Sequence, residues 1–141
     1  MTTYAATFAR MRRLAGSPRL VCVKPRAQWS SVPSGYTFDA SYDAFLDSNG
    51  AVWKPTTSSD LSASDYVTVP FLPVGGSMAQ ALAAGGLVDE GTRYGHILTG
   101  DAVTVQVAQW LEIDGYAYNL AECTATPAGA PQWYVLRLTK R

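Results

Sequence analysis

The side chains that could do chemistry in this chain are few and scattered. His96 is the sole histidine, and Cys22 and Cys123 are the only two cysteines among 141 residues. A catalytic site needs an acid, a base or a nucleophile held beside its partners. No nucleophile motif flanks His96, so we predict that this residue is structural and that the chain is not an enzyme.

Groups that could hold a metal or a nucleotide are equally sparse. The two cysteines lack the spacing of a zinc site and are more typical of small buried side chains than of a disulfide. Asp39, Asp43 and Asp47 recur every four residues, but the loop after Asp47 lacks the later glutamate of a calcium loop. Gly75-Gly76 is not followed by the lysine of a phosphate loop. We expect no metal, no cofactor and no catalytic residue.

Charge is balanced over the whole chain but uneven along it, with 11 basic and 11 acidic residues. Residues 1–26 carry six basic residues and no acidic one, whereas residues 27–136 carry all eleven acidic residues beside Lys54 and Arg93. Three cations follow, including Lys140 and Arg141 at the end. This distribution favours contacts between copies or with a charged neighbour. The alternative is that helix ends and tails carry solvated arginines.

The clearest structural signal lies in residues 100–141. Between residues 103 and 113, apolar side chains fall mainly on odd-numbered positions and alternate with polar ones. This alternation predicts a half-buried strand. Asp114-Gly115 suits a tight type I′ hairpin turn, and a second strand and then a third, Trp133 to Thr139, follow it. We predict a meander of consecutive antiparallel strands over residues 101–139. Its buried side chains are expected to be Val105, Val107, Tyr118 and Leu136.

The N-terminal segment has the periodicity of an amphipathic helix over residues 3–15. Tyr4, Phe8, Met11 and Leu14 fall on one face, and Gly16 can end the helix. Three roles are open for it. It could pack over an opening of the fold, serve as a docking arm for a partner, or act as an acid-free presequence.

The remaining segments predict short strands, turns and one further helix. Leu20–Lys24 and residues 66–71 are typical of strands, residues 26–41 and 55–64 of irregular loops, and Asn49-Gly50 of a hairpin turn. Residues 77–84 are expected to form a short helix between two glycine pairs. This helix could plug one end of the barrel, or it could move on assembly, with Met78 and Leu82 on its docking face and the glycines as hinges.

These elements predict a single mainly β domain over residues 1–141. We expect a small antiparallel β-barrel or sandwich of about six to eight strands over residues 20–141. The N-terminal helix occupies residues 1–16, and the short internal helix lies near residues 77–84. No apolar run is long enough for a membrane-spanning helix, so no membrane partner is expected.

The order of features in the last third of the chain resembles the neck proteins of tailed bacteriophages. The nearest likeness is to the head-closure (stopper) and related head–tail connector proteins. The likeness covers under a third of the chain and consists of a strand, an Asp-Gly turn, a Tyr-x-Tyr strand, a Pro/Gly loop and an aromatic residue before a Leu-x-Leu ending. The residues that carry it are Gly100-Asp101, Ile113-Asp114-Gly115, Tyr116, Tyr118, Trp133, Leu136, Arg137 and Leu138.

The resemblance implies a structural subunit of the virion neck, made in the host cytoplasm. In that family the strands form a small β-barrel, and copies assemble as a ring between the portal or adaptor protein and the tail. Double-stranded DNA would pass through the channel without specific binding, in agreement with the acidic middle of the chain, since acidic surface repels phosphates. The interface candidates are Arg10, Arg12, Arg13, Met78, Leu82, Lys140 and Arg141.

Two other functions stay open on the sequence. One is a tail terminator or another tail-side connector of the same virion. The other, from a different class, is a β-barrel module that binds a small ligand or a peptide. The first alternative differs from the neck subunit only in its place in the particle, whereas the second would need a pocket.

Overall fold

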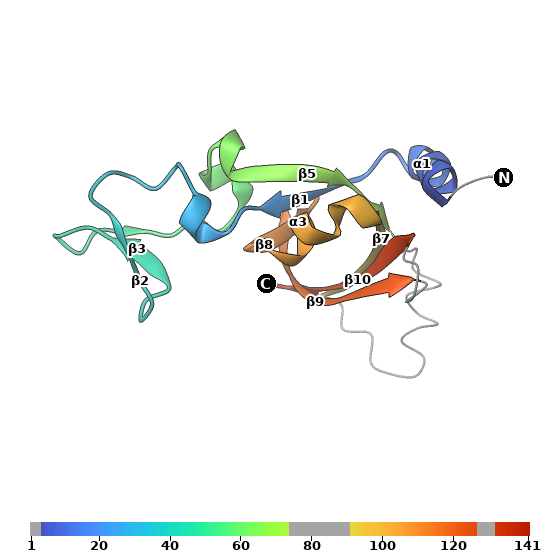
Figure 1. The fold of residues 1–141 in the computed structure, drawn as a ribbon. Helices are drawn as coiled ribbons and strands as arrows, with labels where there is room; N and C mark the ends of the chain where they lie inside the picture. Colours follow the sequence, from blue (N-terminus) through green and yellow to red (C-terminus); the bar gives the residue numbers. More distant parts are fainter. Residues whose placement is uncertain (1–3, 74–90, 127–131) are drawn as a thin grey trace.

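The computed structural model describes residues 4–73, 91–126 and 132–141, which form a curled β-sheet body and a narrower arm that projects from it (Figure 1). The body contains a seven-stranded sheet in the order β5-β1-β8-β9-β10-β7-β6, and every pairing in it is antiparallel. Its strands are β1 (Arg19–Val23), β5 (Tyr66–Pro70), β6 (Leu72–Pro73), β7 (Thr92–Leu98), β8 (Trp110–Ile113), β9 (Tyr116–Thr126) and β10 (Trp133–Lys140). The mainly β fold is therefore confirmed.

The two edges of this sheet are consecutive in the chain. Strands β5 and β6 are separated only by Phe71, yet β5 pairs with β1 and β6 pairs with β7. The sheet therefore curls, and its two edge strands, β5 and β6, are joined directly through Phe71. No ladder joins β5 to β6 among the described strands, so the sheet is not a closed barrel and resembles a sandwich.

The core of the body lies inside this curl. Leu20, Ile97, Leu136 and Leu138 are fully buried, one each from β1 and β7 and two from β10. Tight packing also fixes Gly95 in β7, because a Cβ atom there would overlap the Phe71 ring. Only glycine lets the ring lie this close to the strand.

The C-terminal meander is confirmed for its three strands. β8, β9 and β10 follow one another as antiparallel neighbours, and Tyr118 and Leu136 are buried. Asp114 and Gly115 have φ values of 52° and 83°. Two positive φ values are the signature of the type I′ turn that the Asp-Gly pair predicts.

The predicted strand over residues 103–107 is wrong. Residues 99–106 form a 3-10 turn, Thr99–Asp101, and the helix α3 (Ala102–Gln106). Because β7 and β8 are separated by β9 and β10 in the sheet, the chain must cross over two strands here, and α3 packs against β9 as it does so. Val105 is buried as expected, but Val107 is exposed, since the helix turns it away from the core.

The N-terminal helix is confirmed as α1 (Tyr4–Leu14), although its apolar face is only partly covered. Phe8 is buried against the body, whereas Met11 and Leu14 are exposed. Gly16 follows the helix with a φ of 90°, the left-handed conformation that ends many helices. Of the roles left open for this helix, packing over the fold applies to its first two turns.

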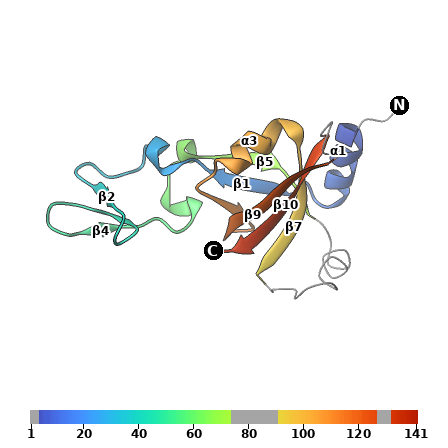
Figure 2. The same cartoon turned by 60° about the horizontal axis from the view of Figure 1, so that its bottom comes forward.

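The arm is an insertion between β1 and β5, and it carries a small sheet of its own. This sheet contains β2 (Thr37–Asp39), β3 (Ala44–Leu46) and β4 (Val52–Trp53), joined as antiparallel neighbours. The Asn49-Gly50 hairpin is confirmed, with Gly50 at a φ of 81°. Three 3-10 turns lie at the arm's base, namely η1 (Arg26–Gln28), η2 (Ser58–Asp60) and η3 (Ala63–Asp65). Figures 1 and 2 place the small sheet at one end of the molecule and α1 at the other.

Two further expectations concern the helices. The short helix near residues 77–84, with Met78 and Leu82, lies outside the described residues. Within the described ranges, neither helix has the length and apolar character needed to cross a membrane.

Candidate functional site

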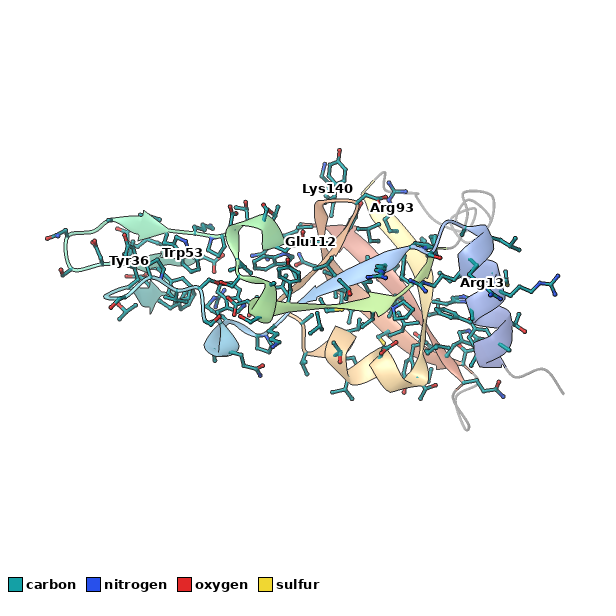
Figure 3. The ribbon with its side chains drawn as sticks, turned by 90° about the horizontal axis from the view of Figure 1, so that it is seen from above. Arg13, Tyr36, Trp53, Arg93, Glu112 and Lys140 are labelled. Atoms are coloured by element: carbon teal, nitrogen blue, oxygen red, sulfur yellow. The ribbon has the colours of Figure 1, made fainter. Side chains whose placement is uncertain are left out.

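The arm is joined to the body by a cluster of aromatic rings. Trp29 contacts Phe45 and Trp53 of the arm at centroid distances of 6.0 and 6.2 Å, and Trp110 of the body at 5.6 Å. Its indole nitrogen donates a hydrogen bond to the carbonyl oxygen of Lys24 at 2.7 Å. Edge-to-face ring pairs contribute beyond their buried area, so Trp29 is the central residue of the junction. Trp53 points into this junction from the arm sheet (Figure 3).

A buried carboxylate ties the start of the arm to its end. Asp65 in η3 is fully buried and accepts backbone hydrogen bonds from Ser30 and Ser31 at 2.7 and 2.9 Å, as well as bonds from both serine hydroxyls. Burial alone would raise the pKa of Asp65, but these hydrogen bonds lower it to about 2. The carboxylate is therefore charged and fully satisfied, which is typical of a structural clamp rather than of a catalytic acid.

A second buried carboxylate has the same role on the other side of the junction. Glu112 in β8 accepts hydrogen bonds from the Ser58 backbone nitrogen at 2.7 Å and from the Trp110 indole at 2.8 Å. The Ser58 hydroxyl adds a third bond at 3.0 Å. Both buried acids thus hold polar loops of the arm against the body.

Cations gather where the arm meets the body. The Arg26 guanidinium stacks over the Phe38 ring at 3.8 Å and lies 3.3 Å from Asp43. At the C-terminal end of β10, the Arg141 guanidinium stacks over Trp110 at 4.3 Å. Burial lowers the pKa of Arg141. Arg141 therefore lies at the junction, so this predicted interface residue is partly engaged within its own chain.

The arm exposes two large apolar side chains. Tyr42 is 68% exposed and Val52 is 62% exposed. Phe38 lies on the other face of the small sheet from Val52, because Phe38 pairs with Phe45 whereas Val52 pairs with Leu46. We call Tyr42 and Val52 the arm surface. Residues 31–53 hold Asp39, Asp43 and Asp47. Asp43 pairs with Arg26 at 3.3 Å and with Lys54 at 3.9 Å, so its charge is compensated within the chain.

The opposite end of the molecule exposes apolar and basic side chains together. Leu14 is 82% exposed and Met11 is 50% exposed on α1. Arg10 and Arg13 lie on the same stretch and are exposed, and Figure 3 shows Arg13 extending from the end of the molecule. We call Arg10, Met11, Arg13 and Leu14 the helix surface.

Arg12 differs from the other two predicted interface arginines of α1. Its Nε donates to the carbonyl oxygen of Pro18 at 2.7 Å, and one terminal nitrogen donates to that of Ser17 at 3.3 Å. These bonds hold the turn that connects the helix to β1. Arg12 is therefore placed to stabilise its own chain.

His96 fastens α1 to the body. The Tyr4 hydroxyl lies 2.9 Å from His96 Nδ1, and the Tyr4 ring stacks on Trp133 at 4.1 Å. Burial lowers the pKa of His96 and raises that of Tyr4 to about 12. Both groups are therefore neutral near pH 7, which suits a half-buried hydrogen bond between two elements.

Two hollows open on the body. One, of about 230 Å³, is an apolar groove between α3 and the β1–β5 edge, where Val67, Val103 and Val107 are exposed. We call these residues the valine groove. The other, of about 340 Å³, is more polar and includes Arg19 and Arg93 in its wall.

The groups that could have done chemistry are separated. Cys22 is buried and Cys123 is half-buried, and both are free thiols. Burial raises the pKa of Cys22 to about 12, with a further rise from nearby Asp101. Over the described ranges, no three histidine, cysteine or acidic side chains are grouped as a metal site would need. Asp39, Asp43 and Asp47, which recur every four residues in the sequence, are spread over strands and turns of the arm.

The structure thus places the predicted interface residues in two separate regions. Arg10, Arg12 and Arg13 lie on α1, whereas Lys140 and Arg141 end β10 near the base of the arm. Sequence reasoning missed the arm surface, because nothing in residues 31–53 indicates which aromatic rings turn outward. It also missed the two buried carboxylates, whose serine partners are common in any polar loop. Comparison with family models, curated proteins and solved structures gives no match for this chain.

Proposed function

We propose that this chain is a structural subunit of a tailed-phage neck, which forms a ring between the portal side and the tail side and surrounds the DNA channel. Two separate supports lead to this function. The first is the resemblance of the C-terminal strands and their Asp-Gly turn to head-closure proteins. The second is the distribution of exposed apolar residues.

The observation that carries the proposal is the pair of unlike surfaces at opposite ends of the molecule. The arm surface exposes Tyr42 and Val52, and the helix surface exposes Met11 and Leu14 beside Arg10 and Arg13. A subunit with two different contact surfaces associates head to tail, and head-to-tail contacts close into rings when the rotation permits. This geometry favours a ring subunit over a symmetric dimer.

The ligand-binding module has weaker support. Apolar ligand sites of proteins are clefts of about 300–1,000 Å³ that bury most of the ligand. The valine groove, at about 230 Å³, is smaller than that and lies open at the surface. The hollow of about 340 Å³ reaches this size, but its lining is more polar and includes Arg19, Arg93 and Asp114. A shallow apolar groove suits contact with another protein better than enclosure of a small molecule.

The proposal is tested by removing the chain from the phage that encodes it. Electron microscopy of the resulting lysate should show filled heads and free tails that do not join, and added purified protein should restore complete particles. Tails that attach normally without the chain would exclude a neck role. Particles whose tails are abnormal in length would instead indicate a tail terminator.

A further inference from the structure

We infer that the outer edge of strand β5 and the valine groove beside it form one site, which binds an extended peptide segment of another protein as an added strand. The segment carries apolar side chains at alternate positions and a carboxylate at its C-terminal end. Strand addition of this kind combines main-chain hydrogen bonds with pockets for alternate side chains. The site does not depend on the proposed ring, because its occupant is not a second copy of this chain.

Strand β5 forms one edge of the seven-stranded sheet, and β1 is its sole partner among the described strands. Alternate residues of an antiparallel strand direct their main-chain groups to the same neighbour. Phe71, directly after β5, donates to the carbonyl oxygen of Pro18, directly before β1, at 3.2 Å. Counting back from Phe71, the odd-numbered residues face β1, so Tyr66, Thr68 and Pro70 face outward.

The outward main-chain groups of this edge are unpaired. Tyr66 and Thr68 each present an N–H and a C=O, whereas Pro70 presents a C=O alone. Within residues 4–73, 91–126 and 132–141, no hydrogen bond occupies these groups. A row of unpaired main-chain groups is a template for another strand. The row ends at Pro70, so it suits a short peptide segment.

The valine groove lies on the side of this free edge. Figures 2 and 3 show β5 between β1 and α3, and the groove is lined by Val67 of β5 and by Val103 and Val107 beside it. These three side chains are 38%, 69% and 53% exposed. A peptide residue opposite Val67 directs its side chain to the face on which Val67 lies, as direct partners in a ladder do. Every second side chain of the segment therefore covers the groove.

Charge selects the chemistry at the end of the segment. Lys24 is the charged residue in the wall of the groove, and it makes no ion pair with any other residue that the structure describes. Its main-chain nitrogen donates to the Asp65 carbonyl oxygen at 2.9 Å, so it lies where β5 begins. The Asp65 carboxylate turns instead to Ser30 and Ser31. A strand that runs antiparallel to β5 ends at this point and brings its C-terminal carboxylate to Lys24.

A second copy of this chain suits the site less well. Two β5 edges could pair antiparallel about Thr68, which would place residues 70–73 of one copy beside Lys24 of the other. Residues 66–73 contain no acidic residue, so Lys24 would stay without a counter-charge. The unpaired cation therefore favours a different protein as the partner.

The test begins with peptides selected on the whole chain. A library of random short peptides with free C-terminal carboxylates is selected on the immobilised protein, and the most enriched peptide is labelled and titrated by fluorescence anisotropy. The same peptide is also made with a C-terminal amide, and with N-methyl groups that remove alternate main-chain donors. These two modifications alter the contacts without any change in the protein.

Three variants of the protein separate the parts of the site. Thr68→Pro removes an outward N–H and leaves the ladder with β1 intact, since proline is tolerated on an edge strand where its missing donor faces solvent. Val103→Ser with Val107→Ser makes the groove polar, and Lys24→Gln removes the cation. Val52→Ser, at an exposed valine of the arm, is the matched control.

We expect enriched peptides to carry Val, Ile or Leu at alternate positions. Thr68→Pro, the double serine variant and N-methylation of the peptide should each weaken binding at least about tenfold. Lys24→Gln and the C-terminal amide should each weaken binding roughly threefold to fivefold, as for a partly exposed ion pair. The amide should bind the wild type and Lys24→Gln equally, because both changes remove the same contact. Val52→Ser should bind like the wild type.

Four outcomes would overturn the inference. One is a selection that enriches no peptide, and another is binding that survives both Thr68→Pro and N-methylation. Unchanged affinity in Lys24→Gln would contradict the carboxylate end of the segment. Self-association of the wild type in sedimentation velocity, abolished by Thr68→Pro, would make the edge an interface between copies. The neck proposal is decided separately by whether tails join heads in the particle experiment.

Discussion

The body and the arm are both antiparallel sheets, yet they are stabilised by different means. The body has long ladders around a core of fully buried aliphatic side chains. The arm has strands of only two or three residues, and its cohesion comes from edge-to-face ring pairs and hydrogen-bonded carboxylates. Isolated short hairpins are marginal in water. The strands of the arm therefore depend on the junction with the body to stay folded.

The largest expected effect is on the body, from Gly95→Val. A Cβ atom at this position would overlap the buried Phe71 ring and lie 2.9 Å from the Leu72 carbonyl oxygen. Overpacking of this kind should lower the free energy of unfolding by about 3 kcal/mol or more, measured by urea denaturation. The matched control is Gly100→Ala, where nothing lies within 4 Å. Equal stability of the two variants would contradict the tight packing of the body.

The next effect should separate the arm from the body. Trp29→Ala removes the ring that contacts both Phe45 of the arm and Trp110 of the body. We expect a loss of about 2–3 kcal/mol that is local to the arm. Hydrogen exchange should quicken at β3 and β4 and stay slow at β10. Trp29→Phe should retain most of the protection, and uniform loss of protection in both sheets would show that body and arm unfold as one unit.

Acid should act on the arm through Asp65. The pKa of this carboxyl is about 2 in the folded chain against an ordinary value of 3.8. Because the folded pKa is the lower one, the stabilisation is present above about pH 4 and is lost as the pH falls toward 2. Asp65→Asn should cost about 2 kcal/mol at neutral pH, since hydrogen bonds to a charged acceptor are weakened.

The measurement for Asp65 is urea denaturation at several pH values between 5 and 2. The wild type should lose stability across this window, and Asp65→Asn should lose less. Asp114→Asn, at an exposed turn of the body, is the control that should follow the wild type. If the wild type and Asp65→Asn had the same stability at every pH, the charged Asp65 carboxylate would not stabilise the junction, and this prediction would be wrong.

The smallest expected effect concerns the attachment of α1. Burial holds the pKa of His96 below 6.5, so the unfolded chain takes up a proton first as the pH falls. Stability contributed by the neutral ring is therefore present above pH 6.5 and declines below it. Exchange at the amides of α1 should quicken between pH 7 and 5. His96→Asn should abolish that dependence, and an unchanged profile would show that Tyr4 and Trp133 hold the helix without His96.

Much of the body could be predicted from the sequence, because its signals are local. Asp114-Gly115 requires positive φ at both positions, so it fixes the turn and the register of β8 and β9. Leu111 and Ile113 are apolar and alternate with Glu112, a pattern that predicts strand β8. The N-terminal helix could also be predicted, because its apolar residues recur with helical periodicity and Gly16 marks its end.

Other parts depend on contacts that sequence patterns do not contain. The valines at 103, 105 and 107 alternate as in a strand, but strand β8 has to reach β1 on the far side of β9. A crossover helix satisfies this need and buries Ala102 with Val105, three residues apart. The arm surface likewise depends on which rings Trp29 attracts, and Trp29 lies sixteen residues before Phe45 in the sequence. Local propensity cannot rank such alternatives.

The arm has a further property that follows from where it enters and leaves the body. Val23 ends β1 and Tyr66 begins β5, and these two residues are direct partners in one ladder. The whole arm is therefore the loop of a single hairpin. Doubling the length of such a loop costs only about 0.6 kcal/mol of closure entropy. Evolution can lengthen, shorten or exchange this segment, provided that the junction contacts of Trp110 and Glu112 are kept, so related chains can change their partners while the curled sheet stays the same.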